Sequence, residues 1–258
     1  MSDPVSALFE QELTRRGISF RLDDETHLYR IEHQGGNLLV SLDNLARAYH
    51  RDPDGSRIAT FVDVVLGNRF ENRPWPEAQS SILFALEPSD HVDPSELRIP
   101  ISKQVDRVPV YVSDVPRGTI TWITQAMLNE WNISLAELET TASHNLATAL
   151  AAAKVACTEI DGVRLGIIET DLAFKTALIL APNLREVVSP TLGWPLLAVI
   201  PDRDFLYLWT AEHRDFTDRV SEVVVREFKA SPYPLTTEVF EIGDAGIVAI
   251  GAFPVAET

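Results

Sequence analysis

The chain has 258 residues, enough for one large domain or two small ones, and a charged fraction of 23% that is ordinary for a globular protein. Its net charge is −16 and neither half carries an excess of basic residues, so no phosphate-neutralising patch for nucleic acid is visible. The acidity is compatible with a partner that has a basic surface.

The opening third predicts the order α-β-β-β-α-α. An N-terminal helix starts near Pro4, ends at Gly17 and places four apolar residues on one stripe: Val5, Leu8, Phe9 and Leu13. Strands are expected over 18–22, 27–33 and 37–42. Two helices follow, one from about residue 42 to 49 and one through 58–66, which Gly67 closes.

Prolines set off the next segment. Residues 73–100 contain Pro74, Pro76, Pro88, Pro94 and Pro100, around one strand-like run at 81–86. Proline fixes φ and removes a backbone donor, so long regular structure is not expected there. The sequence therefore predicts an N-terminal α/β subdomain over 1–72, a proline-containing connection with one strand over 73–100, and a C-terminal α+β domain over 101–258.

The C-terminal part alternates hairpins with helices. Strands are predicted over 108–114, 119–123 and 176–181, with a short helix over 124–131. Ser134 and Glu137 form a capping box that opens a long helix, and Asp161-Gly162 marks the turn of a hairpin over 155–168. Two strands follow in 195–209, then a helix that Asp215 would cap, then a closing hairpin. This order predicts an α+β fold of two subdomains, with largely antiparallel, hairpin-rich sheets packed with amphipathic helices.

The stretch Pro201-Asp202-Arg203-Asp204 has two interpretations. Pro201 and Asp202 suit the central positions of a β-turn, and Asp204 can accept a hydrogen bond from a backbone amide. Asp202 and Asp204 could instead form a small acidic catalytic site. The turn is the stronger prediction, with Pro201, Asp202 and Arg203 at a strand-to-strand connection and Asp204 entering the next strand. It leaves Arg203 unexplained, and Arg203 with Asp204 could also anchor a partner.

A second pattern involves the same aspartate. Pro201-Asp202, followed at a distance by Glu227 and Lys229, matches a loose nuclease pattern in which two carboxylates hold a divalent ion and a lysine positions water. That chemistry needs adjacent strands, whereas Glu227 falls near the end of a predicted helix. Asp202, Asp204 and Glu227 are therefore only candidate catalytic residues of a metal-dependent hydrolase.

Three further residues invite a functional interpretation. His144 and Asn145 are polar residues in an alanine-rich helix, and either tie that helix to the following hairpin or form a binding site that faces Asp202 and Asp204. Cys157 lies in an apolar strand, where a buried and inert thiol is the default expectation.

Several classes of site lack support in the sequence. No glycine-rich nucleotide loop, no Gly-x-Ser-x-Gly and no metal-binding spacing of histidines occurs, so we expect no cofactor and no metal. One cysteine cannot form an internal disulfide, which is typical of a reducing compartment. The start of the chain lacks the features of a signal peptide, and no apolar run approaches the ~18 residues of a membrane span. A cytoplasmic protein without membrane association is the prediction.

Four stretches of the chain resemble the YtpQ-like family of uncharacterised bacterial proteins. They are "FRLDDETHLYRIEHQGGNLLVSLDNL", "VYVSDVPRGTITWITQAMLNEWNISLAELETTASHNL", "AVIPDRDFLYLW" and "YPLTTEVFEIGDAGIVAI". Pro201 and Asp204 match a Val-x-Pro-x-x-Asp segment of that family. The resemblance implies a bacterial cytosolic protein and no established catalytic residues.

Taken together, these patterns predict a non-enzymatic binding or protein-interaction module whose partner is a protein or peptide with a basic surface. The alternative is a metal-dependent hydrolase built on Asp202 and Asp204, with Glu227 or Asn145.

Overall fold

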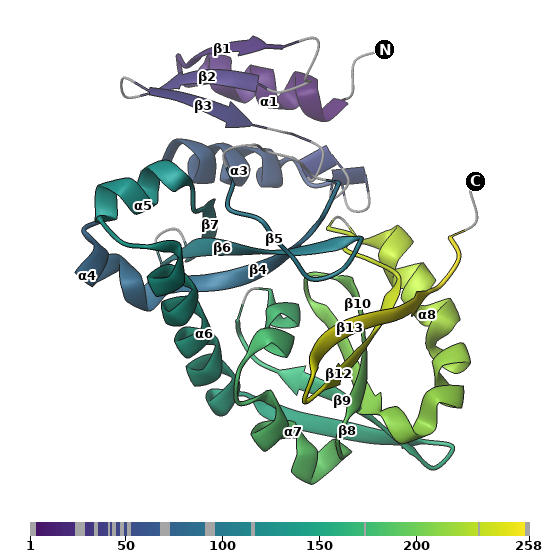
Figure 1. Ribbon diagram of the computed structural model, residues 1–258. Helices are drawn as coiled ribbons and strands as arrows, with labels where there is room; N and C mark the ends of the chain where they lie inside the picture. Colours follow the sequence, from purple (N-terminus) through teal and green to yellow (C-terminus); the bar gives the residue numbers. More distant parts are fainter. Residues whose placement is uncertain are drawn as a thin grey trace. The chain divides into compact units, whose positions relative to one another are not determined.

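The structure is a computed structural model, and Figure 1 shows its helices and strands. It describes residues 4–23, 29–33, 36–40, 42, 45–46, 49–50, 53–67, 73–90, 96–114, 117–172, 174–231 and 233–255. The chain divides into two compact units. Unit 1 contains Met1–Glu71 with Asp114–Thr119, and unit 2 contains Asn72–Ser113 with Ile120–Thr258.

Unit 1 pairs an amphipathic helix with a small sheet. It contains α1 (Pro4–Arg15), β1 (Ser19–Leu22), β2 (Tyr29–His33), β3 (Gly36–Val40) and α3 (Ser56–Gly67), with the strands in the antiparallel order β1-β2-β3. The predicted stripe of α1 is buried against β2 and α3. Gly17, at φ +68°, ends α1 in a Schellman motif, because Gly17 N–H bonds Thr14 O and Ile18 N–H bonds Leu13 O. The helix predicted over 42–49 lies partly outside the described residues.

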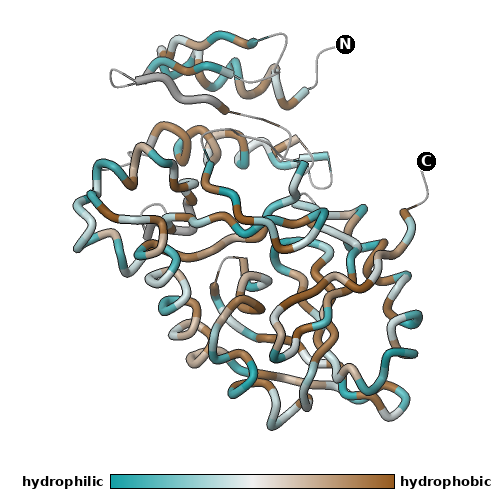
Figure 2. The backbone as a smooth tube through the Cα atoms, in the orientation of Figure 1, coloured by the Kyte–Doolittle hydropathy of each residue, from teal (hydrophilic) through white to brown (hydrophobic). Residues whose placement is uncertain are grey.

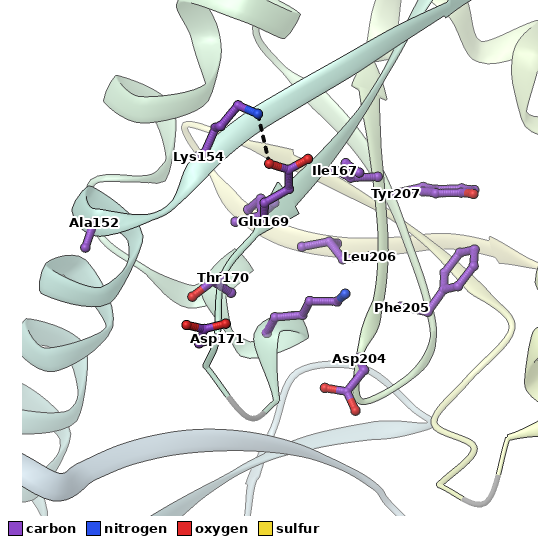
Figure 3. Close-up of a pocket in the computed structure, with 12 residues that line it drawn as sticks. Ala152, Lys154, Ile167, Glu169, Thr170, Asp171, Asp204, Phe205, Leu206 and Tyr207 are labelled. Atoms are coloured by element: carbon purple, nitrogen blue, oxygen red, sulfur yellow. Dashed lines mark hydrogen bonds and ion pairs between the residues drawn. The ribbon is translucent and has the colours of Figure 1, made fainter. Parts of the chain in front are cut away.

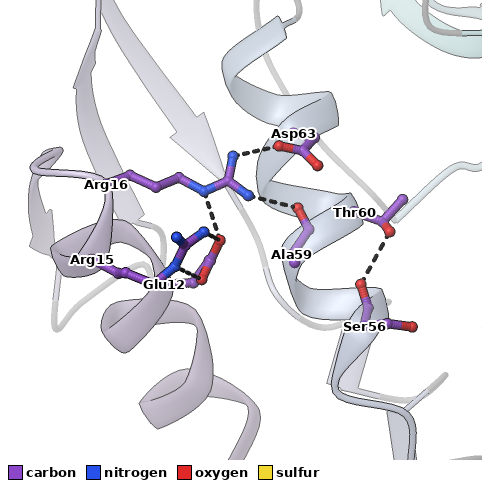
Figure 4. A network of polar contacts seen from close by, with 7 residues as sticks. All are labelled: Glu12, Arg15, Arg16, Ser56, Ala59, Thr60 and Asp63. Carbon is purple, nitrogen blue, oxygen red and sulfur yellow. Dashed lines mark hydrogen bonds and ion pairs between the residues drawn. The ribbon is translucent and has the colours of Figure 1, made fainter.

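Arg16, the residue directly after α1, joins this helix to α3 (Figure 4). Arg15 and Arg16 both donate hydrogen bonds to the carboxylate of Glu12, and Arg16 also bonds the Asp63 carboxylate and the Ala59 carbonyl. The hydrogen bonds from Arg15 and Arg16 lower the pKa of Glu12 to about 2. The ionised form of Glu12 therefore stabilises the end of α1.

Unit 2 is built on two antiparallel sheets. The larger has the order β13-β12-β10-β11-β9-β8, and the smaller has the order β4-β6-β5 with β7 also paired to β6. The strands are β4 (Ile82–Pro88), β5 (Ile99–Pro100), β6 (Val105–Asp114), β7 (Arg117–Trp122), β8 (Lys154–Ile160), β9 (Val163–Glu169), β10 (Leu196–Asp202), β11 (Phe205–Thr210), β12 (Glu238–Gly243) and β13 (Gly246–Ala252). The last residue of β6 and the first three of β7 are grouped with unit 1. Because the sheets are mostly antiparallel and helices alternate with hairpins, the predicted α+β class is confirmed.

Helices cover both faces of the larger sheet. The helices of unit 2 are α4 (Trp75–Ala78), α5 (Gln125–Trp131), α6 (Leu135–Ala152), α7 (Leu184–Leu192) and α8 (Thr217–Ala230), with 3-10 turns η1 (Gln79–Ser81), η2 (Lys175–Leu180) and η3 (Ala211–Phe216). Leu197, Val199 and Trp209 pack against α8, whereas the residues between them face the main core with α6, α7 and η2. Figure 2 shows the corresponding apolar stretches along the central strands. Among the described helices, none combines the length and apolar character that crossing a bilayer requires.

Short sequence motifs, such as helix caps and turn residues, predicted the positions of most helices and strands correctly. The Ser134 side chain accepts a hydrogen bond from Glu137 N–H at the start of α6, as the capping box predicts. The β8–β9 hairpin turns at Asp161 and Gly162, whose φ values are +51° and +81°. The closing hairpin is β12–β13.

Two element predictions are wrong. Residues 176–181 do not form a strand, because η2 occupies Lys175–Leu180 and buries Thr176, Ala177, Leu178 and Ile179 in succession. A short apolar run is compatible with either a strand or a buried helical turn. Asp215 does not cap α8, since it lies inside η3 and the N-cap of α8 is Phe216.

Cys157 is exposed, which corrects the expectation of a buried thiol. It lies on β8, the last strand of the larger sheet, where a neighbouring strand is present on one side only. The apolar residues next to Cys157 in the sequence were therefore not a reliable sign that its side chain is buried.

The segment 73–100 carries a core strand. Six of the seven residues of β4 are buried, and β4 pairs with β6 along its whole length in unit 2. Two prolines of this segment stand at strand ends. Pro88 is the last residue of β4 and Pro100 the last of β5, so these prolines delimit strands.

We predict that replacing Glu12 with glutamine weakens α1 in a pH-dependent way. The lowered pKa means that the ionised carboxylate stabilises the folded state above pH 4.5 and that this contribution is lost as pH falls towards about 2. Hydrogen exchange of α1 amides, corrected for intrinsic rates, should be faster in Glu12→Gln at pH 7 and should approach wild type near pH 2. The exposed carboxylate of Glu32 gives the control variant Glu32→Gln, and a pH-independent difference for Glu12→Gln would contradict the prediction.

Candidate functional site

A strand-to-strand connection is present as predicted, but its turn lies two residues further on, and the expectation that Asp204 enters the next strand is wrong. β10 ends at Asp202, β11 begins at Phe205, and Arg203 and Asp204 form the turn between them. The Asp202 carboxylate accepts the Asp204 N–H at 2.7 Å. Pro201 belongs to β10, where its carbonyl accepts the Leu235 N–H at 2.8 Å. Asp202 therefore holds the turn together.

Arg203 forms a buried ion pair with Glu87 of β4. One guanidinium nitrogen lies 2.7 and 2.6 Å from the two Glu87 carboxylate oxygens, and the exposed fractions of the two side chains are 16% and 2%. The guanidinium also lies over the rings of Phe174 and Tyr233, at 5.5 and 4.8 Å from their centroids. The arginine between Asp202 and Asp204 is thus explained by its pairing with Glu87 in the smaller sheet.

The Arg203 backbone fixes the start of η2. Its carbonyl accepts the Thr176 N–H at 3.3 Å and the Thr176 hydroxyl at 3.0 Å. Phe174 has φ +61°, an uncommon conformation for a bulky residue, and its ring reaches Arg203 from there. Because these contacts join the β10–β11 turn to residues 174–176, they also set the positions of Asp204 and Lys175.

A second buried cation lies on the smaller sheet. Arg98 bonds Asp106 at 2.9 Å, Glu96 at 2.8 Å and the Pro88 carbonyl at 2.5 Å. Burial alone would lower the pKa of Arg98, but the hydrogen bonds to Asp106 and Glu96 outweigh it and raise that pKa. Asp106 is the cross-strand partner of Glu87, so both ion pairs brace the same end of β4 and β6.

Next to the Arg203 turn lies an open pocket of about 900 Å³ in unit 2 (Figure 3). Its apolar lining comes from β9 and β11 and includes Ile167, Leu206 and the aromatic pair Phe205 and Tyr207, whose ring centroids are 4.4 Å apart. Its polar lining comes from four segments: Lys154, Glu169, Thr170, Asp171, Lys175 and Asp204. This combination of an apolar surface with a few polar groups is typical of ligand sites.

The charges around the pocket are only partly neutralised within the chain. Lys154 donates to Glu169 at 3.0 Å, so these two residues satisfy each other. Within the described parts of the chain, Asp171 and Lys175 form no ion pair or side-chain hydrogen bond, and the Asp204 carboxylate has no partner. Figure 3 shows Asp171 and Asp204 on the side of the pocket away from the Lys154–Glu169 pair. Asp171, Asp204 and Lys175 can therefore all bond to a ligand.

The other candidate residues lie outside this pocket. Asn145 donates to the carbonyls of Gln79 and Ile82, at 2.8 and 2.7 Å, and so ties α6 to η1 and β4. His144 is exposed on α6. Glu227 lies on α8, where its carboxylate accepts hydrogen bonds from Arg226.

The carboxylate cluster that the alternative of a metal-dependent hydrolase requires is not assembled among the described residues. No three histidine, cysteine, aspartate or glutamate side chains in that part of the chain are arranged to hold a metal ion. Asp202 is used by the turn and Glu227 pairs with its neighbour on α8, so the nuclease pattern of Asp202, Glu227 and Lys229 gains no support from the geometry.

Sequence reasoning missed the residues that surround Arg203 and Asp204. Glu87 stands 116 residues before Arg203, and the pocket takes Asp171 and Lys175 from a loop and a 3-10 turn. The only available signal was an unexplained arginine next to an apolar hairpin, which indicates a buried partner without identifying it.

We predict that Glu87→Gln lowers the free energy of unfolding of unit 2 by about 3 kcal/mol, because it leaves the Arg203 guanidinium buried without a counter-charge. The exposed pair Lys154–Glu169 gives the control: Lys154→Gln should cost less than about 1 kcal/mol. Urea titration followed by tryptophan fluorescence measures both, since all five tryptophans are in unit 2. Equal costs for the two variants would contradict the prediction.

No protein-family model, no curated protein sequence and no solved structure matches this chain. The resemblance to the YtpQ-like family stays a prediction, and the site rests on its own geometry.

Proposed function

We propose that the protein is a non-enzymatic binding module that holds a short basic and partly apolar segment of a protein or peptide in the pocket beside β11. The observation that carries this proposal is the pocket of about 900 Å³ with the Phe205–Tyr207 ring pair and the two unpaired carboxylates of Asp171 and Asp204.

The size and lining of the pocket support a peptide segment. Its volume lies in the range of about 300–1,000 Å³ that is typical of sites for ligands of small-molecule size. That range corresponds to a few side chains of a peptide. Phe205 and Tyr207 can receive an apolar or guanidinium group through dispersion and cation–π contacts.

The charge of the pocket favours a basic segment. Lys154 and Glu169 neutralise each other, so Asp171 and Asp204 outweigh Lys175 by one negative charge. The net charge of −16 on the whole chain would also accelerate the approach of a basic partner. Lys175 is placed to meet a carbonyl or carboxylate oxygen of the same ligand.

A cytoplasmic location and a bacterial origin are compatible with this proposal, but it does not depend on them. The alternative of a metal-dependent hydrolase around Asp202 and Asp204 also stays a prediction. Its test is a thermal shift with divalent cations that an Asp202→Ala/Asp204→Ala variant abolishes.

The binding proposal is tested with two labelled hexapeptides, one alternating arginine with phenylalanine and one alternating glutamate with phenylalanine. We expect fluorescence anisotropy to show saturable binding of the arginine peptide and none of the glutamate peptide. Asp171→Asn/Asp204→Asn should weaken binding of the arginine peptide at least tenfold, because each carboxylate contributes a charge-assisted hydrogen bond of about 1.5–3 kcal/mol.

A control variant separates the pocket from the overall charge. Asp218→Asn/Glu222→Gln removes the same two charges from exposed positions of α8 and should leave the affinity nearly unchanged. Equal loss of affinity in the two double variants would mean that the peptide is attracted by the overall charge, and the pocket would then be excluded as the binding site.

A further inference from the structure

The pocket beside β11 is lined by two lysines that differ in their surroundings. Lys154 is exposed and donates to Glu169 at 3.0 Å, so its charge is balanced within the chain. Lys175 is half-buried, and within the described part of the chain its ammonium group has no acidic residue at ion-pair distance. Partial burial removes water from an ammonium group, which increases the benefit of an anionic acceptor. The ammonium group of Lys175 is therefore available to an anionic group of a ligand.

The backbone around Lys175 is held in place by contacts within the chain. On one side, the Phe174 ring centroid lies 5.5 Å from the Arg203 guanidinium. On the other side, Thr176 is fully buried, and its N–H and hydroxyl both donate to the Arg203 carbonyl. The Ala177 N–H donates to the Phe174 carbonyl at 2.9 Å and closes the turn around Lys175. Because the base of the lysine side chain is fixed, less conformational entropy is lost when its ammonium group binds an anion.

The unpaired charges of the pocket match a ligand that carries both signs. Asp171 and Asp204 can each accept hydrogen bonds from a cationic or N–H group, whereas the Lys175 ammonium group can only donate. An internal arginine of a peptide supplies a cation, but its backbone acceptors are neutral carbonyls. An arginine at the C-terminus supplies a guanidinium, a backbone N–H and an α-carboxylate on one residue. A C-terminal arginine therefore offers a partner to all three charged groups.

We propose that the pocket binds the C-terminal arginine of its peptide partner. Lys175 binds the α-carboxylate of that residue, and the carboxylates of Asp171 and Asp204 bind its guanidinium and backbone N–H. This inference rests on the proposed function, because it concerns the same pocket and the same class of partner. It makes Lys175 the residue that distinguishes the end of a peptide from an internal segment.

Two arginine-phenylalanine hexapeptides that end in arginine and are labelled at the N-terminus test the inference by fluorescence anisotropy. They differ only at the C-terminus, where one has a free α-carboxylate and the other an amide. We expect the wild-type chain to bind the amide at least tenfold more weakly, because Lys175 then loses a charge-assisted hydrogen bond. Attraction by the net charge of −16 predicts the opposite order, since amidation makes the peptide more positive.

Two lysine variants locate the site of the α-carboxylate. Lys175→Gln should lose the preference for the free acid over the amide. Lys103→Gln removes the same charge from an exposed position outside the pocket and should keep the tenfold preference. A Lys175→Gln variant that keeps the preference would overturn the inference. The comparison of the two peptides on the wild-type chain does not depend on how either variant folds.

The outcomes separate this inference from the proposed function. If the wild-type chain binds the amide as tightly as the free acid, the inference is refuted and the proposed function is unaffected. A third peptide is amidated and carries a glutamate after the last arginine. If it binds as tightly as the free acid, Lys175 accepts a side-chain carboxylate and the assignment to the C-terminus is refuted. If none of the peptides binds, the proposed function and the inference are refuted together.

Discussion

The ion pair between Arg203 and Glu87 is the interaction on which the candidate site depends. Removing a guanidinium and a carboxylate from water costs several kcal/mol for each group, and only close pairing with additional contacts offsets that cost. Here Glu87 accepts two short hydrogen bonds, and the rings of Phe174 and Tyr233 lie against the guanidinium. Four segments that are far apart in the sequence meet at one side chain, and the pocket lies beside them.

The parts of the fold that could be predicted are those that local chemistry determines. A glycine at positive φ ends α1, a serine hydroxyl caps α6, and Asp161-Gly162 adopts the positive φ values of a tight hairpin turn. Each of these signals acts within a few residues, so a single sequence contains all the necessary information. The hairpin of β10 and β11 was predictable for the same reason, although its turn lies two residues later than expected.

The parts that could not be predicted depend on contacts between distant segments. The run at 176–181 has the composition of a strand, but it is buried on all sides after the left-handed residue Phe174 and forms a 3-10 turn. Asn145 was recognised as unusual, yet its partners are the carbonyls of Gln79 in η1 and Ile82 at the start of β4. Of the pocket, only Asp204 was identified, because Asp171, Lys175 and Tyr207 belong to three different elements whose proximity no local pattern encodes.

The charged residues of β8 have a consequence for the size of any assembly. Strand addition at a sheet edge can in principle repeat without limit, as in a fibril. In this chain the β8 edge of the larger sheet presents Lys154 and Glu159, and its end at Ile160 turns straight back into β9. Charged side chains on an edge strand oppose the addition of a further strand, so Lys154 and Glu159 disfavour open-ended growth of the sheet at this edge.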